Sequence, residues 1–291
     1  MSALTAVSAR RRRTDRLMRG LLSTGTVLAL VPLVLVLFFI VKKGLGAWSL
    51  DFFTTDPNGK FFGDAGGIRS AILGTLEIVG LASLIAIPTG LGIAIYLTEY
   101  GQGGRLAAAV RFFIDVMTGV PSIVFGLFIY ITLVVTGVGG GSFAGWKASL
   151  ALALLMLPIV TRSCEVILHQ VPDSLREAAL ALGAPRWRVI ARVVLPTALP
   201  GIITGSLLAV ARAAGETAPL LFATAIVSET TYNLNQRMNA LPLTIFNDLK
   251  QPRAELVDVA WGAALTLVLM VLILSLIARL IQRRSRLGGV T

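Results

Sequence analysis

The distribution of hydrophobic residues divides the chain into six long apolar stretches, separated by segments in which charged residues, glycine and proline gather. Each stretch has about 20 residues or more, which is the length that a helix needs to cross the hydrocarbon core of a bilayer. Backbone amides cannot remain unpaired in lipid, and the alternation typical of a membrane β-barrel is absent, so each stretch is predicted to be helical. The predicted spans comprise residues 21–41, 72–96, 112–135, 148–168, 199–222 and 257–281. The pattern therefore predicts an all-α polytopic membrane protein with six transmembrane helices.

Composition agrees with this fold class. Hydrophobic residues make up 55% of the 291 positions and charged residues 14%, and the mean hydropathy is +0.82, values that a soluble domain rarely reaches. The formal net charge of +11 could indicate a nucleic-acid-binding protein. However, many basic residues lie next to the spans, where they orient helices and meet anionic lipid headgroups. We therefore expect contact with membrane lipid and no nucleic-acid partner.

The placement of the basic residues predicts the orientation of the spans. Arginine is concentrated before the first span, after the last span and in the loops that follow the second and fourth spans. This excess places both termini in the cytoplasm. The first apolar stretch is long enough to span and no clear cleavage site closes it, so it is predicted to be a retained helix and not a signal peptide. The expected organisation is a basic cytoplasmic segment (1–20), a first span with an extracytoplasmic loop (21–66), a core of five spans (67–282) and a cytoplasmic tail (283–291).

Residue counts exclude most enzyme chemistry. Cys164 is the only cysteine and His169 the only histidine, so an internal disulfide is impossible and a metal cluster is not expected. An intramembrane enzyme would need a nucleophile with a base, or a metal set, and neither can be assembled. The glycines at 139–141 are not followed by the Lys-Ser/Thr of a P-loop, and no such motif occurs elsewhere. The chain is therefore expected to have no catalytic site and not to hydrolyse ATP itself.

One polar segment between two spans, residues 172–196, has a demanding pattern. It contains Glu177, Ala178 and Ala179, then Gly183, and nine residues later an aliphatic-x-Leu-Pro sequence. Asp173 or Ser174 is expected to cap a first helix, with Ser174 and Glu177 at capping-box spacing. Gly183 suits the left-handed position that ends such a helix, and Pro185 is well placed to begin a second helical piece that runs into the fifth span. A loop this ordered on the cytoplasmic side is typical of a docking surface for a soluble partner, and we call residues 172–196 the docking loop.

Charged residues also occur inside the predicted spans. Arg162 and Glu165 are three apart, and Arg212 and Glu216 are four apart, so each pair shares one helical face. Ionised side chains in the bilayer usually face a pathway or one another. The pairs are therefore either structural ion pairs or positive charges that line the path of an anion, for which the forked donors of arginine are suited. Glu77 is a third intramembrane charge and a possible partner for an arginine.

Gly215 and Pro219 flank Glu216. Both residues weaken a helix locally, which fits a bend or a gate at the charged site. Close helix packing at Gly215 is the alternative.

Together these segments resemble the permease subunits of type I ABC importers. The resemblance covers roughly residue 68 to the end of the chain and is most specific in the docking loop and in residues 211–222 and 241–246. The run Arg-Ala-Ala-Gly-Glu-Thr from Arg212, followed by Ala-Pro-Leu-Leu-Phe, is most similar to the permeases of phosphate importers. The resemblance implies a bacterial inner-membrane protein of the type I importer fold.

The resemblance also implies partners and roles. A sister permease would complete the pore, two copies of a separate ATPase would consume the ATP, and an extracytoplasmic phosphate-binding protein would deliver inorganic phosphate; this chain would bind no cofactor. The positions that match the docking motif of the family are Glu177, Ala178, Ala179 and Gly183. The residues expected to affect transport are Arg162, Glu165, Arg212 and Glu216. The outer segment 224–256 is a candidate contact for the binding protein, and the aromatic-rich segment 44–67 is either interfacial or a partner contact.

Two alternatives remain open. The first is a permease of the same architecture for another oxyanion, molybdate or sulfate, which the docking loop cannot distinguish. The second is a self-contained transporter or channel driven by an ion gradient, against which the docking loop argues.

Overall fold

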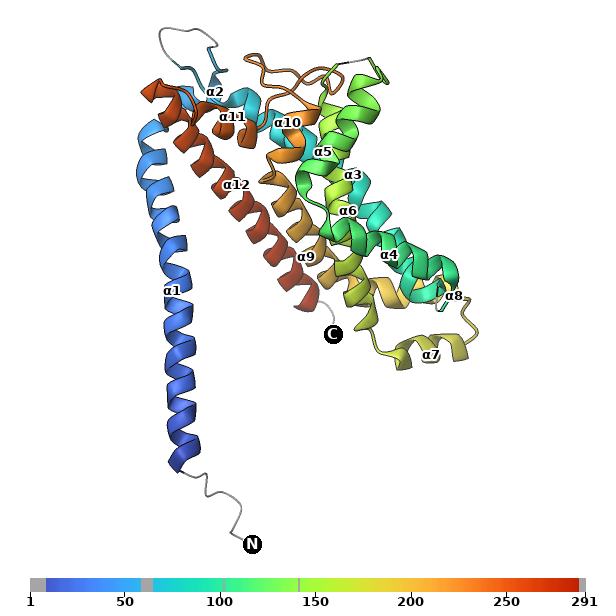
Figure 1. Ribbon diagram of the computed structural model, residues 1–291. Helices are drawn as coiled ribbons and strands as arrows, with labels where there is room; N and C mark the ends of the chain where they lie inside the picture. Colours follow the sequence, from blue (N-terminus) through green and yellow to red (C-terminus); the bar gives the residue numbers. More distant parts are fainter. Residues whose placement is uncertain (1–8, 59–64, 102, 141, 288–291) are drawn as a thin grey trace.

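The computed structural model describes residues 9–58, 65–101, 103–140 and 142–287, and the chain is helical over most of these ranges (Figure 1). In the described part, the β-type pairing is a single isolated bridge between Pro57 and Gly66. Three short π-helical turns continue or precede longer helices. The all-α prediction is therefore confirmed.

Five helical segments of the described residues are long and apolar enough to cross a bilayer. They are α1 (Ala9–Ala47), α3 (Arg69–Ile95) with the π-turn η1 (Tyr96–Tyr100), α6 (Gly145–His169), α8 (Arg186–Val189) with η3 (Ile190–Val194) and α9 (Leu195–Ala214), and α12 (Ala254–Leu287). A bent pair of helices makes a sixth if it is taken as one span. These six segments correspond to the six predicted spans.

The third predicted span, residues 112–135, is wrong as one straight helix. It is divided into α4 (Arg105–Gly119) and α5 (Ser122–Ile129), with η2 (Tyr130–Val135) continuing α5, and the two parts are bent by 104°. The cause is Pro121, since a residue that precedes proline is driven out of the helical region. Val120 accordingly adopts φ −74° and ψ 130°.

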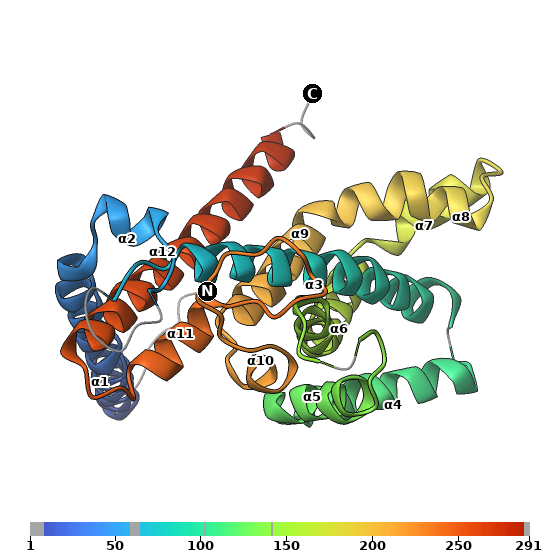
Figure 2. The ribbon, with the colours of Figure 1, turned by 90° about the horizontal axis from the view of Figure 1, so that it is seen from above.

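The fifth predicted span, residues 199–222, is also interrupted. Helix α9 ends at Ala214, Gly215 follows as its C-cap, and α10 (Ala218–Ala223) begins with Pro219 in its first turn. The predicted weakening of the helix between Gly215 and Pro219 is therefore confirmed. The two interrupted spans pack together through α5 and α10 (Figure 2). Gly126 permits this approach, because a Cβ atom there would lie 2.7 Å from the Cα atom of Pro219.

The main core lies where α6 packs between α3 and α9. Its fully buried side chains include Ile78 of α3, Leu152, Met156 and Val160 of α6, and Ala209 of α9. Cys164 is buried in the same core. Because the centre of this core is α6, Arg162 and Glu165 of that helix are held beside tightly packed apolar neighbours.

Helix α1 stands apart from this core. It contacts α12 near one end, where a Cβ atom on Gly44 would overlap Leu265, and diverges from it toward the N-terminus (Figure 1). Almost all of its apolar side chains are exposed. The free ends of α1 and α12 point to the same side of the molecule as α7 (Asp173–Ala181).

The opposite end carries α2 (Leu50–Thr54) and α11 (Leu241–Asp248). Phe52 is buried in a second apolar cluster with Leu241 and Ala263, so this aromatic residue serves the core and is not available to a partner. Phe61 and Phe62 of the same predicted surface lie outside the described residues. Residues 241–248 fold inward as α11, so only part of the predicted outer segment 224–256 remains an exposed loop.

Asp56 joins the two outer loops at this end. Its carboxylate accepts hydrogen bonds from Nη2 of Arg69 at 2.9 Å, and from the backbone amide of Thr230 at 3.0 Å and its hydroxyl at 2.5 Å. Burial alone would raise the pKa of Asp56, but these hydrogen bonds and the charge of Arg69 outweigh it and hold that pKa below its usual value. The outer loops are therefore tied together through an ionised carboxylate.

Candidate functional site

The docking loop forms a helix, a turn and a second helix, as predicted. Helix α7 covers Asp173–Ala181, Gly183 has a φ of +79°, and α8 runs through η3 into α9 without a break. The predicted side-chain cap is wrong: Asp173 already lies in the first turn, and Pro172 occupies the cap position with no side-chain hydrogen bond. Pro172 directly precedes the helix, and its ring restricts φ to a value that is compatible with a helix start.

The predicted docking residues lie on an open surface. No residue of α7 is buried, Glu177 and Ala178 are exposed, and Ala179 is half-buried. Leu175, Leu180 and Trp187 are exposed around them, and Leu182 has 88% of its surface exposed. An exposed cluster of large apolar side chains on a rigid loop marks an interaction surface.

Arg176 holds this loop against the rest of the molecule. Its guanidinium donates to Oε1 of Glu99 from Nη2 at 3.0 Å and from Nε at 3.2 Å. It also donates to the carbonyl oxygens of Leu168, in the last turn of α6, at 2.9 Å and of Val171, just after that helix, at 2.6 Å. Glu99 lies in η1 and is buried. Sequence reasoning missed Glu99, whose signal is an acidic residue at the end of an apolar span that faces an arginine-rich loop.

Arg162 and Glu165 form the predicted pair, but within a larger cluster. Nη1 of Arg162 lies 2.7 Å from Oε2 of Glu165, and Arg162 also forms an ion pair with Asp115. Nε of Arg111 lies 2.9 Å from Oε1 of Glu165. Arg111 and Asp115 are four residues apart on α4, so two guanidinium groups and two carboxylates join α4 to α6. The sequence alone did not connect α4 with this pair. We call these four residues the ion cluster.

Arg212 and Glu216 are arranged differently. Nε of Arg212 lies 3.5 Å from Oε1 of Glu216, and no hydrogen bond joins them in the described structure. The side chain of Arg212 is 63% exposed, whereas that of Glu216 is 18% exposed. Both lie at the interruption between α9 and α10. Arg212 therefore has donors free for another anion, while the donors of Arg162 are directed at carboxylates.

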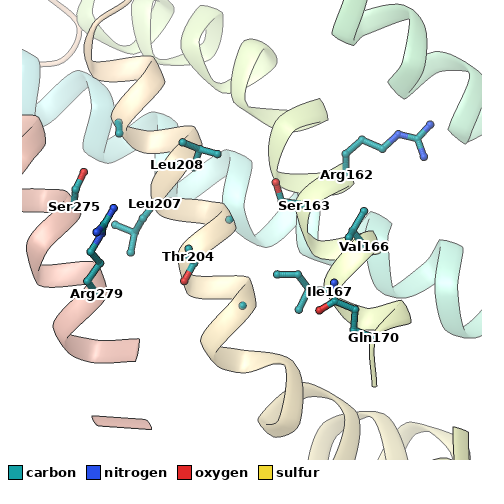
Figure 3. A pocket seen from close by; sticks show the side chains of 13 residues that line it. Arg162, Ser163, Val166, Ile167, Gln170, Thr204, Leu207, Leu208, Ser275 and Arg279 are labelled. Atoms are coloured by element: carbon teal, nitrogen blue, oxygen red, sulfur yellow. The ribbon is translucent and has the colours of Figure 1, made fainter. Parts of the chain in front are cut away.

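A cavity of about 610 Å³ lies between α6, α9 and α12 (Figure 3). Arg162 lies at its edge and points away from α12, and Arg279 of α12 points toward α9. Ser163, Gln170 and Thr204 add polar groups. Arg212 does not line this cavity, although the preceding Ala211 does, so the structure does not bring the two predicted arginines into one pocket. Arg279 was missed because its sequence position resembles an ordinary cytoplasmic flank.

Glu77 has no ion pair with an arginine among the residues that the structure describes. Its side chain is half-buried on α3. The predicted arginine partner is therefore not found among the described residues.

Comparison with known proteins identifies relatives over almost the whole chain. Residues 86–287 match the family of binding-protein-dependent transport system inner membrane components. The phosphate transport system permease protein PstA of Yersinia pestis is 42% identical over 278 residues, which cover 95% of this chain and 92% of that protein. The phosphate transport system permease protein PstA 1 of Mycobacterium tuberculosis is 40% identical over 290 residues, covering 96% and 92%.

Solved structures show the same fold. A chain of a bacterial alginate ABC transporter in complex with a pentasaccharide-bound periplasmic protein superposes with a TM-score of 0.67 at 18% identity, covering 94% of this chain and 96% of that one. A chain of the inward-facing MetNI methionine ABC transporter has a TM-score of 0.60 at 18% identity, covering 75% and 95%. At this identity the likeness concerns the architecture alone.

Proposed function

We propose a phosphate-transport function for this chain, which belongs to the family of binding-protein-dependent transport system inner membrane components. It is the transmembrane permease subunit of a phosphate ABC importer. The observation that carries this assignment is its likeness to phosphate permeases over 95% or more of its length. The chain is not itself an enzyme, and a separate ATPase subunit supplies the energy.

The docking loop is the proposed attachment point of that ATPase. Its apolar residues are exposed on one surface, with Glu177 among them as an acceptor for charge-assisted hydrogen bonds. Helices α8 and α9 continue from the loop without interruption to Arg212. A displacement of the loop is therefore passed along one rigid element to the interrupted part of the fifth span.

Arg212 is the proposed contact for the anion in the translocation path. Its guanidinium is fixed in charge, exposed and only loosely paired with Glu216, and a planar fork of donors matches an oxyanion. Glu216 keeps the site from retaining the anion too tightly. Arg162 and Glu165 act less directly: they hold α4 against α6, and these two helices form a wall of the path.

The remaining partners follow from the same proposal. A sister permease covers the faces that this chain leaves open, and a phosphate-binding protein contacts the outer loops. Both termini lie in the cytoplasm of the bacterial cell, on the side of the docking loop.

The test is uptake of radiolabelled phosphate into proteoliposomes that hold this chain with a sister permease, an ATPase and a binding protein. We expect uptake that requires ATP and resists competition by sulfate and molybdate. If sulfate or molybdate competes and is taken up instead, the assigned substrate changes to that oxyanion, and the importer architecture still stands. Uptake without ATP by this chain alone would overturn the mechanism.

A further inference from the structure

We propose that Arg176 and Glu99 are a positioning pair that passes movement of the docking helix to the bent third span. This inference rests on the proposed function, because an ATPase must move α7. The docking loop is already connected to the fifth span through the continuous backbone of α8 and α9. The proposed pair provides a second connection, to the third span. The route consists of side-chain contacts and ends at the ion cluster.

The first step is the attachment of α7 itself. No residue of α7 is fully buried, and Ala179 is its one side chain that packs, partly buried, against the main core, so apolar packing holds α7 only at that point. The side chain of Arg176 is only 17% exposed. Its guanidinium donates hydrogen bonds to Glu99 and to two carbonyl oxygens at the end of α6. A forked guanidinium with several acceptors holds both a distance and an angle. Arg176 therefore fixes α7 to η1 and α6 together.

The second step leads from η1 to α4. The carbonyl oxygen of Leu97, two residues before Glu99, accepts a hydrogen bond from Nη2 of Arg111 at 3.0 Å. The same guanidinium lies 2.9 Å from Glu165 through its Nε atom. Arg111 thus connects η1 to the ion cluster. From α7 to α6 the chain of polar contacts contains no link longer than 3.2 Å.

The third step is the capacity of these elements to move. Glu99 and Leu97 belong to a π-helical turn, a rare conformation that is often found at functional sites. A cavity of about 520 Å³ lies beside η1, α7 and α8 and is lined by Glu99, Arg176 and Arg186 among others, so these elements are not packed solidly against one another. On the far side, α4 meets α5 at a bend of 104°. A tilt of η1 therefore acts on the middle of α4, through Arg111, and α4 ends at the bend after Gly119.

A purely structural pair would behave differently from a coupling pair. If Arg176 and Glu99 only keep the loop folded, their loss removes ATPase binding and transport together. If they transmit movement, the ATPase stays bound and hydrolyses ATP while less phosphate moves per ATP. The ratio of phosphate transported to ATP hydrolysed separates the two.

The experiment compares Glu99→Gln with Asp15→Asn in the reconstituted complex. Asp15 is the matched control, since its carboxylate is exposed on α1, outside the docking loop and the ion cluster, and the change removes the same charge. We expect Glu99→Gln to keep the ATPase bound and to lower phosphate moved per ATP by about tenfold, the factor for one buried charge-assisted hydrogen bond. Asp15→Asn should match the parent.

Arg111→Lys tests the second step, because lysine keeps a charge near Glu165 without the fork that also reaches Leu97. We expect the ratio to fall with the ATPase still bound. The inference is overturned if both variants transport like the parent. It is also overturned if Glu99→Gln releases the ATPase while Arg111→Lys is fully coupled. A parent complex that takes up no phosphate overturns the importer assignment and this inference with it, whereas a working parent beside unaffected variants overturns the inference alone.

Discussion

At the scale of single residues, the arginines of this chain differ chiefly in their partners. Arg176 and Arg162 are each held by carboxylates of other elements, so their charge is largely committed to the fold. Among the described residues, Arg212 has one carboxylate contact, between its Nε atom and Oε1 of Glu216 at 3.5 Å, and its side chain is exposed. A guanidinium with free donors attracts an anion, whereas a paired one positions helices. We therefore expect the loss of Arg212 to affect the anion most directly.

The Arg212→Gln variant should assemble normally and transport at least about tenfold less phosphate, since one charge-assisted interaction with the anion is lost. Arg237→Gln is the control, because Arg237 is exposed on an outer loop and the net charge changes equally. Uptake rates in proteoliposomes measure the difference. Normal transport by Arg212→Gln would contradict the anion contact. A variant in which Arg212 and Glu216 are exchanged should also transport less phosphate than the parent. Normal transport by this variant would indicate that the two residues form only a structural ion pair.

Asp56 predicts a response to pH at the outer loops. Its pKa is lowered in the folded protein. The stability it contributes is therefore complete above its unfolded-state pKa of about 4 and is lost as pH falls through the lower folded-state pKa. Asp56→Asn should cost about 1 kcal/mol at neutral pH and nothing at the acid end. Hydrogen exchange of residues near Thr230, followed from pH 7 downward, would show the two proteins converging; a constant difference would contradict this.

At the scale of elements, the interruptions of the third and fifth spans decide how α5 and α10 meet. The interruption after Gly119 could be inferred from the sequence, because Pro121 excludes Val120 from a helix. The length of the apolar stretch alone did not indicate this interruption, since the segments on both sides of it are apolar. The contact between Gly126 and Pro219 could not be inferred, because it joins residues that are far apart in the chain. Periodicity locates elements, while only packing shows where two interrupted elements touch.

Gly126→Ala should destabilise the protein by about 1–3 kcal/mol, since the new methyl group would lie against the backbone of Pro219. Gly80→Ala on α3 is the matched control, because a Cβ atom there meets nothing within 4 Å. The control should be neutral or slightly stabilising, as alanine favours helices. Thermal unfolding in detergent distinguishes the two, and equal midpoints would refute the close approach of α5 and α10.

At the scale of the whole molecule, the second helical part of the docking loop and the fifth span up to its interruption belong to one continuous helical segment, residues 186–214. The spans and the docking loop could be predicted, because long apolar runs and a spaced motif are local features. The route through Glu99, Leu97, Arg111 and Asp115 could not, because each contact joins residues from different spans. Sequence patterns therefore predicted the individual helices and the loop, whereas the contacts between them are seen only in the structure.

Glu177→Lys should leave the chain folded in the membrane and abolish phosphate uptake by releasing the ATPase. Glu177 is exposed and forms no ion pair within the described residues, so charge reversal costs the isolated chain little. Glu229→Lys, on an exposed outer loop, makes the same charge change away from the docking surface. Co-purification of the ATPase measures the effect. Equal ATPase recovery with Glu177→Lys and with the parent would refute the docking role.

The burial of Cys164 has a practical consequence for following this molecule at work. The only thiol of the chain is enclosed in the core around α6. Water-soluble maleimides should therefore leave the native protein unlabelled, and a cysteine substituted at an exposed position of α7 would be the single reactive group. A fluorophore or spin label can then report the travel of the docking helix during ATP turnover, without first removing a native cysteine.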